Sequence, residues 1–163
     1  MADVPSSPVD GYRRIQWVPT IADTLAPKMT EINAASAKDL SCYFVTFDGT
    51  GEQATIADPR VCSVQDFERP GKETRALTST YIVNPQSTTD NVASVTLAPN
   101  TPGFFIDRTG IPYDTAFAVG QKVDVWPVTS GVQSKVNEAG SVSRASQKQF
   151  VTGRVRQDVA IVA

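Results

Sequence analysis

The chain has 163 residues, of which 40% are hydrophobic and 20% charged, with a net charge of −2 and no histidine. This length and composition are typical of one globular domain that can bury its own core. The net negative charge argues against strong attraction to nucleic acid. Without histidine, Ser-His-Asp triads, Cys-His pairs and imidazole metal ligands are excluded.

The chain divides into a short arm and one domain. Residues 1–10 contain two prolines and no apolar cluster, which predicts a flexible N-terminal arm before a domain over residues 11–163. Neither a signal-peptide pattern nor an apolar run of membrane-spanning length is present. We therefore expect a protein folded in the cytoplasm, with no membrane contact.

The first part of the domain alternates short strands with one helix. Arg14–Val18 reads as a strand, and the apolar spacing from Pro27 to Leu40 predicts a helix of one or two turns. Ser41–Phe47 is rich in aromatic and β-branched residues, and Gly49-Thr50-Gly51 predicts a hairpin turn after it.

The next segment predicts two further strands separated by a turn. Arg60–Val64 reads as a short strand, and Pro70-Gly71 as a turn before a longer strand over Glu73–Asn84. One face of that longer strand is large and apolar, and the other is mostly small or hydroxylated, as in a sheet with one packed and one wet face. The packed face comprises Leu77, Tyr81 and Val83.

The second half continues this pattern around a long polar insert. Thr89–Leu97 predicts a short helix, Gly103–Arg108 and Lys122–Thr129 predict strands, and Phe150–Val162 predicts a final strand. In the final strand, the apolar residues of one face are Val151, Val155, Val159 and Ile161. The insert over residues 130–149 reads as a long polar loop, which in a compact domain is usually functional or disordered.

These elements define the fold class. Several short strands with turns between them and one or two short flanking helices predict a mainly β protein, either a β-sandwich or a barrel. Two cysteines, Cys42 and Cys62, are too few for a disulfide framework. About the predicted turn they lie nearly opposite each other, so either two small buried thiols or a late disulfide fits the sequence.

Patterns that could carry chemistry are weak. Gly49-Thr50-Gly51-Glu52-Gln53-Ala54 resembles a dinucleotide-binding loop, but too few residues follow before Pro59 for the crossover helix. Asp107 and Asp114 could form a carboxylate pair, although acids beside a loop are more often turn caps. No cofactor is expected, and the sequence favours a protein without enzymatic activity.

Four arginines and two tryptophans admit binding roles. Arg13-Arg14 and the pair Arg154 and Arg156 could contact phosphate, but surface or subunit-interface charges are the favoured interpretation. Trp17 and Trp126 could stack on sugars, although tryptophan in a strand is more often core or interface packing.

The C-terminal half resembles a known family. The segments that carry the resemblance are Phe104-Phe105-Ile106-Asp107-Arg108-Thr109-Gly110, Ala118–Val128 and Phe150-Val151-Thr152-Gly153, with Pro27…Glu31-Ile32-Asn33-Ala34 and Asp39-Leu40-Ser41 before them. Together they resemble the major tail proteins, or tail-tube proteins, of long-tailed, non-contractile phages, particularly those that infect actinobacteria.

The resemblance implies a structural virion protein that is assembled in the host cytoplasm and resides in the tail. Such proteins form rings of six copies whose edge strands pair into a continuous inner barrel. The rings stack into a tube around the tape-measure protein, between the tail terminator and distal tail proteins. Viral DNA then passes through the bore without tight binding, and no metal or cofactor is implied.

We assign two sets of candidate assembly residues on this basis. The first set, expected to contact the next ring, comprises Gln133, Lys135, Val136, Glu138 and Arg144. The second, expected to face a neighbouring subunit or the bore, comprises Arg154, Arg156, Asp158, Thr78 and Thr80. The alternatives are a β-sandwich module of a phage particle that binds a carbohydrate or receptor, and a carboxylate-based hydrolase.

Overall fold

The computed structural model describes residues 3–163, which form eight strands and two short helices. All eight strands belong to one antiparallel sheet in the order β2-β1-β5-β6-β7-β4-β3, and β8 pairs with β6 beside this path. The predicted mainly β class with short flanking helices is confirmed. The element bounds are β1 Arg13–Val18, α1 Met29–Ile32, β2 Lys38–Asp39, β3 Phe44–Asp58, β4 Phe67–Ile82, α2 Val92–Thr96, β5 Pro102–Thr109, β6 Lys122–Val136, β7 Arg144–Val151 and β8 Arg156–Ala160.

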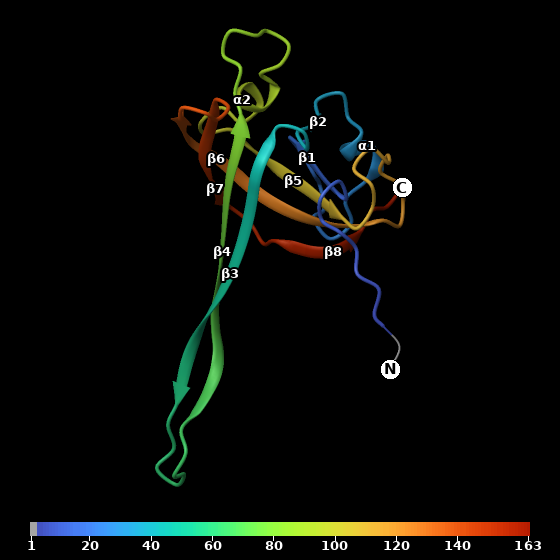
Figure 1. The fold of residues 1–163 in the computed structure, drawn as a ribbon. Coiled ribbons are helices and arrows are strands. Elements are labelled where there is room, and N and C mark those ends of the chain that lie inside the picture. Colours follow the sequence, from blue (N-terminus) through green and yellow to red (C-terminus); the bar gives the residue numbers. More distant parts are fainter. Residues whose placement is uncertain (1–2) are drawn as a thin grey trace.

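The sheet curls over itself, so that strands from its two ends meet. Phe47 of β3 packs edge-to-face on Phe105 of β5, with ring centroids 5.0 Å apart. Arg13 of β1 donates a hydrogen bond of 3.1 Å to the Phe47 carbonyl. The two ends of the strand order therefore lie together and enclose a core, which produces the sandwich-like body in Figure 1.

Two apolar clusters lie on the two faces of the β1-β5-β6 layer. The inner cluster includes Trp17, Phe105 and Trp126 and continues to Leu77 and Tyr81 of β4. The outer cluster is covered by α1 and the loops around it, and its buried residues are Val18, Ile21, Ile32, Ile106, Phe117, Val123, Val125 and Ile161. Alternation along each strand explains the division, because successive side chains point to opposite faces. Leu77, Tyr81 and Val83 are buried as predicted.

The largest difference from the sequence prediction is a long hairpin arm. β3 and β4 pair from Phe44 to the turn after Asp58, and their distal halves project far from the body (Figure 1). The predicted turn at Gly49-Thr50-Gly51 is wrong, because these residues lie inside β3 and pair with β4. A Cβ at Gly49 would lie 2.5 Å from the Trp126 ring. This glycine permits close packing within a strand instead of a turn. Pro70-Gly71 likewise lies within β4, and 60–64 belong to the arm's turn rather than to a strand.

The polar insert over 130–149 is mostly strand. β6 continues to Val136 and β7 begins at Arg144, with cross-strand pairs from Ser130↔Gln149 to Val136↔Arg144 and a bulge near Gly131. Only 137–143 connect the two strands. The prediction of a long loop failed because serine and glutamine are common in loops, whereas here their backbones pair and several of their side chains are buried.

The predicted final strand over 150–162 is two strands. β7 ends at Val151 and β8 begins at Arg156. β7 pairs with β4, whereas β8 pairs with the start of β6. Val151 and Val155 consequently pack on the inner cluster, whereas Val159 and Ile161 belong to the outer one. The prediction that these four residues share one face is therefore wrong.

The cysteines and the N-terminal arm complete the comparison. Cys42 precedes β3 and Cys62 lies in the turn of the hairpin arm, and both thiols are free and exposed, so they neither face each other nor lie buried. Residues 3–8 of the predicted arm have no regular secondary structure and are exposed, whereas residues 1–2 lie outside the described part. Both predicted helices are present, each limited to about one turn.

Candidate assembly surfaces

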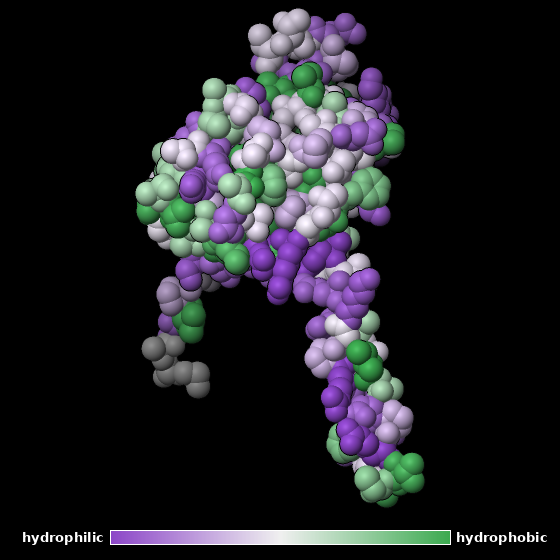
Figure 2. All heavy atoms as spheres, turned by 180° about the vertical axis from the view of Figure 1, so that it is seen from behind, coloured by the Kyte–Doolittle hydropathy of each residue, from purple (hydrophilic) through white to green (hydrophobic). Residues whose placement is uncertain are grey.

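The hairpin arm carries apolar side chains at its end. Val61 and Val64 are fully exposed, and Ile56 and Phe67 are about half exposed, at 54% and 48%. Figure 2 shows hydrophobic atoms at this tip beyond a mostly hydrophilic arm. A free apolar tip gains free energy when another surface covers it, so the arm has the properties of an interaction element.

Three charged residues shape the turn of the arm. Asp58 accepts hydrogen bonds from Arg60 at 3.0 Å and from Arg69 at 2.8 Å. These two bonds, Arg60 first, lower the pKa of the Asp58 carboxyl from its usual value. The triad links β3 to β4 where the two strands separate.

The base of the arm is fixed to the body. Arg13 forms a two-bond ion pair with Asp107 at 2.7 and 3.0 Å, and its guanidinium lies 5.2 Å from the Phe47 ring centroid. Hydrogen bonding of the Arg13 guanidinium to the Asp107 carboxylate is the main cause of a raised Arg13 pKa, opposed by desolvation. Arg13 and Trp126 thus hold the first residues of β3 from two sides, which sets the direction of the arm.

A wet, hydroxyl-rich face runs across β3, β4 and β7. Thr78 is exposed and Thr80 half-buried, as predicted for the wet face of the strand. In register with them lie Lys148 and Ser146 of β7. Thr46 and Thr50 on β3 are exposed as well. No helix or loop within residues 3–163 packs on Thr78, so this face is available to another molecule or to solvent.

Beneath the wet face lies a buried polar network. The Gln147 amide donates to the carbonyls of Leu97 and Gly131, each at 2.7 Å, and its Oε1 accepts from the Tyr81 hydroxyl at 3.0 Å. Burial raises the pKa of Tyr81 to about 12. Because Gly131 lies in the β6 bulge, this amide satisfies a carbonyl that the irregular pairing leaves free. The network fixes the register of β6 and β7.

The residues predicted to contact the next ring lie in several different environments. Gln133 donates to the carbonyls of Ser94 and Leu97 at 2.9 and 3.1 Å, which ties β6 to α2. Lys135 is exposed, and Val136 ends β6 half-buried. Glu138 and Arg144 form an ion pair of 2.9 Å across the connection between β6 and β7. The structure therefore brings Glu138 and Arg144 together and directs Gln133 inward.

The residues predicted to face a neighbouring subunit or the bore are divided between different strands. Arg154 is exposed in the connection before β8 and lines a hollow with Lys72–Arg75 of β4. Arg156 and Asp158 lie in β8, which pairs with β6, whereas Thr78 and Thr80 lie in β4. Asp158 has a positive φ of 54°, and its backbone N–H donates to the Asp124 carboxylate at 2.9 Å. The five residues do not form one continuous strand face.

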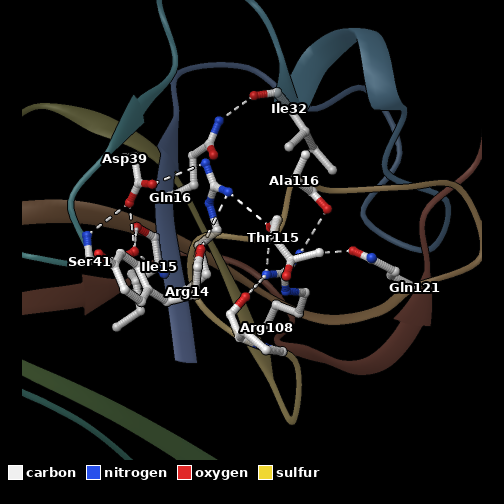
Figure 3. Close-up of polar contacts among 12 residues, drawn as sticks. Arg14, Ile15, Gln16, Ile32, Asp39, Ser41, Arg108, Thr115, Ala116 and Gln121 are labelled. Carbon is white, nitrogen blue, oxygen red and sulfur yellow. Dashed lines mark hydrogen bonds and ion pairs between the residues drawn. The ribbon is translucent and has the colours of Figure 1, made fainter. Parts of the chain in front are cut away.

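A buried arginine hub is the main polar feature that sequence reasoning missed (Figure 3). Arg108 of β5 is 0% exposed and donates to the carbonyls of Pro112, Thr115 and Ala116 and to Gln121 Oε1, at 2.8 to 3.2 Å. Desolvation, with Arg14 nearby, lowers its pKa. These bonds tie the 110–121 loop to β5, and no sequence pattern distinguishes this arginine from an exposed one.

Arg14 completes the hub. It forms an ion pair of 3.0 Å with Asp39 of β2 and donates to the Thr115 carbonyl at 3.0 Å. Arg14 and Arg108 both lie against the Phe117 ring, with centroid distances of 5.0 and 4.8 Å. The hub holds β1, β2 and the 110–121 loop together. The oxygen atoms that accept hydrogen bonds from Arg14 and Arg108 all belong to the protein itself.

The described residues offer interaction surfaces rather than reactive groups. Across residues 3–163, no cluster of acidic or cysteine side chains has the arrangement needed to hold a metal ion. The helices in this part of the chain, four and five residues long, are too short to cross a membrane. Asp107, one of the two acids considered for catalysis, is paired with Arg13. The fold defines a mainly β protein built on one antiparallel sheet with a projecting hairpin arm.

Comparison with known proteins identifies the family. A phage tail tube protein family matches residues 1–163, so the chain belongs to the phage tail tube protein family. It is a structural component of the virion tail, as the resemblance in its sequence implied. A comparison with curated protein sequences found no significant match.

Solved structures with a similar fold come from phage-like particles. The tail of an empty gene transfer agent particle, determined with helical refinement and C6 symmetry, has a chain that is 9% identical, with a TM-score of 0.50. The alignment covers 91% of this chain and 95% of that one. The virion of a native gene transfer agent particle matches with a TM-score of 0.48 and 9% identity, over 74% of this chain and 88% of that one.

Proposed function

We propose that six copies of this chain form a ring and that the rings stack into the tail tube. The hairpin arm is the observation that carries this proposal. β3 ends the strand order, and its 15 residues have no strand partner on their outer side among residues 3–163. An unpaired edge of this length is an aggregation hazard in a monomer, and pairing it with the next copy removes the hazard. The C6 symmetry of the structurally similar tail supports six copies.

Ring closure requires a head-to-tail interface, in which different surfaces of two identical copies meet. An edge strand can take part in such an interface by extending the sheet of its neighbour. Six copies joined in this way close an inner barrel without free edges. In this arrangement, the wet face of β3, β4 and β7 lines the bore.

The chemistry of that face suits a conduit. Its exposed groups are mainly hydroxyls, with acidic Asp48 and Glu52 on β3 and Lys148 on β7. Hydroxyl groups with few net positive charges give weak, nonspecific contacts with phosphate, so DNA passes without being held. The tape-measure protein occupies the same bore before ejection, and tail terminator and distal tail proteins bind the two ends of the tube. The chain acts without enzymatic activity.

Negative-stain electron microscopy of concentrated wild-type protein tests the proposal. We expect hollow filaments or stacked rings of uniform width. A matched variant, Thr50→Pro, removes one backbone donor from β3 and should reduce polymerisation if the edge pairs with a neighbour. Wild-type protein that remains monomeric across the concentration range, as shown by sedimentation velocity, would contradict the proposal.

A further inference from the structure

A basic hollow lies where the hairpin arm leaves the body. Lys72, Glu73 and Arg75 of β4 line it together with Arg154, so its basic residues outnumber the acidic one. Val151 and Val155 provide apolar wall, and both pack on the inner cluster. Figure 2 shows hydrophilic residues on the underside of the body next to the arm. The hollow is therefore suited to a short segment with both acidic and apolar side chains.

The basic charge of the hollow is only partly neutralised within the chain. Arg75 forms an ion pair with Glu73. The ion pairs formed within residues 3–163 include neither Lys72 nor Arg154. Two cations thus face solvent beside an apolar wall. An acidic partner placed there would be attracted to the two cations and would at the same time cover the apolar wall of the hollow.

The N-terminal segment, residues 3–10, has the complementary composition. It contains Asp3 and Asp10, and the first basic residue of the chain is Arg13. Val4 and Val9 are 90% and 63% exposed. The prolines of the segment favour an extended backbone, so ordering it on a partner costs less entropy than ordering a flexible chain.

The segment and the hollow lie on opposite sides of the molecule. Figures 1 and 2 show the N-terminal segment and the hairpin arm leaving the same end of the body on opposite sides. Because the hollow lies at the root of the arm, the segment and the hollow of the same chain lie on different sides of the body. In a ring of copies facing the same way, the side of one copy that carries the segment meets the side of the next copy that carries the hollow.

We propose that residues 3–10 of each copy dock in the hollow lined by Lys72, Arg75 and Arg154 of the adjacent copy. Asp3 faces the cations, and Val4 lies against Val151 and Val155. This inference rests on the proposed ring, and it names one contact that closes the ring. The contact is heterologous, since two different surfaces of the same chain meet.

Disulfide trapping tests the contact directly. In a background with Cys42→Ser and Cys62→Ser, Val4→Cys is combined with Thr152→Cys, which replaces an exposed residue of the hollow's rim. Copper-phenanthroline supplies the oxidant. We expect a ladder of covalent oligomers on non-reducing gels, with dimers as the first step. Val4→Cys combined with Ser134→Cys, an exposed position on β6, is the matched control and should give no ladder.

A ladder of equal intensity in the control pair, or no ladder in the Thr152→Cys pair, would overturn the inference. Gel filtration separates intrachain bonds from bonds between copies, and a solely intrachain bond would also overturn it.

Charge reversal with rescue provides an independent test. Arg154→Glu combined with Lys72→Glu should raise the concentration needed for polymerisation by about tenfold or more. Adding Asp3→Lys should restore part of the loss. The control is Lys122→Glu, an exposed change on β6 that alters net charge equally per residue and should have a smaller effect.

The outcomes separate the two proposals. If wild-type protein polymerises and both the trapping and the reversal have no effect, the docking contact is wrong and the tube remains. If wild-type protein forms no oligomer at any concentration, both proposals fail.

Discussion

The ion pair at the base of the hairpin arm gives a stability prediction that can be worked out from the structure. The change is Arg13→Met, which keeps an unbranched apolar side chain and removes the guanidinium together with its contact with the Phe47 ring. Asp107 is 8% exposed and would lose both of its hydrogen bonds to Arg13. Removing one partner of a buried pair costs about 3–5 kcal/mol, because the remaining charge is left without compensation.

Two corrections to this figure give the loss of stability that we expect from Arg13→Met. The Arg13 side chain is 30% exposed, so solvent screens the ion pair. Losing the ion pair should therefore cost about 2 kcal/mol instead of the roughly 3–5 kcal/mol of a fully buried pair. The lost hydrogen bond to the Phe47 carbonyl adds about 1 kcal/mol. We therefore expect Arg13→Met to lower the free energy of unfolding by about 3 kcal/mol. For a chain of this size, that corresponds to a melting temperature lowered by about 6–12 °C.

Chemical and thermal denaturation followed by circular dichroism measures this loss. Arg60→Met provides the control, because it removes an arginine from an exposed pair with Asp58 and should leave the melting temperature nearly unchanged. The double variant Arg13→Met with Asp107→Leu should be more stable than Arg13→Met alone, since it removes the uncompensated charge. Equal effects of the two arginine changes, or a double variant no more stable than the single one, would refute the reasoning.

Three further changes probe other parts of the body. Gly103→Ala should destabilise by about 1–3 kcal/mol, because the new Cβ would overlap the Trp17 ring, and urea denaturation measures the loss. Asp124→Asn should stabilise at pH 7, because desolvation raises the pKa of this carboxyl and its ionisation in the folded state is therefore unfavourable. The wild-type chain then loses stability as pH rises above about 4, and the advantage of the variant should disappear below that pH. Gln147→Leu should cost about 2–4 kcal/mol, since the buried Gly131 carbonyl loses this donor and the Tyr81 hydroxyl loses its acceptor, and it should speed amide exchange in β6 and β7.

Sequence patterns predicted the strands whose two faces differ clearly in polarity. β1, β5 and the first half of β6 alternate between the inner and outer clusters, and their predicted positions agree with the structure within one or two residues. Tyr81 was assigned to the packed face of its strand for the same reason. In these elements, local propensity and tertiary packing favour the same structure.

The missed elements are those in which tertiary contacts override local composition. Gly49 and Gly71 are typical of turns, but each lies inside the hairpin arm where a neighbouring group comes too close for a Cβ. Gln147 and Gln149 are typical of a polar loop, yet both are nearly fully buried, where the Gln147 amide is hydrogen-bonded at both ends and Gln149 Nε2 donates to Ser79 and Gln147. Arg108 is also fully buried, and its guanidinium donates hydrogen bonds to carbonyls of the 110–121 loop. Such contacts join residues far apart in the sequence, and a single sequence does not reveal them.

The candidate assembly residues show the same division. The wet face that holds Thr78 followed from simple alternation along one strand. Most of the insert over 130–149 is strand rather than loop, its contact with the next ring stays a prediction, and the largest projecting element is the hairpin arm. A hydrophobic tip on a polar hairpin has too few residues to stand out in composition or periodicity.

Cryo-electron microscopy with helical reconstruction of tubes assembled from purified wild-type protein tests the central claim most directly. We predict a hollow tube with six copies per ring, β3 paired at its outer edge with a neighbouring copy, and the Thr78 face lining the bore. A reconstruction in which β3 remains unpaired and the Thr78 face lies on the outside of the tube would contradict the account.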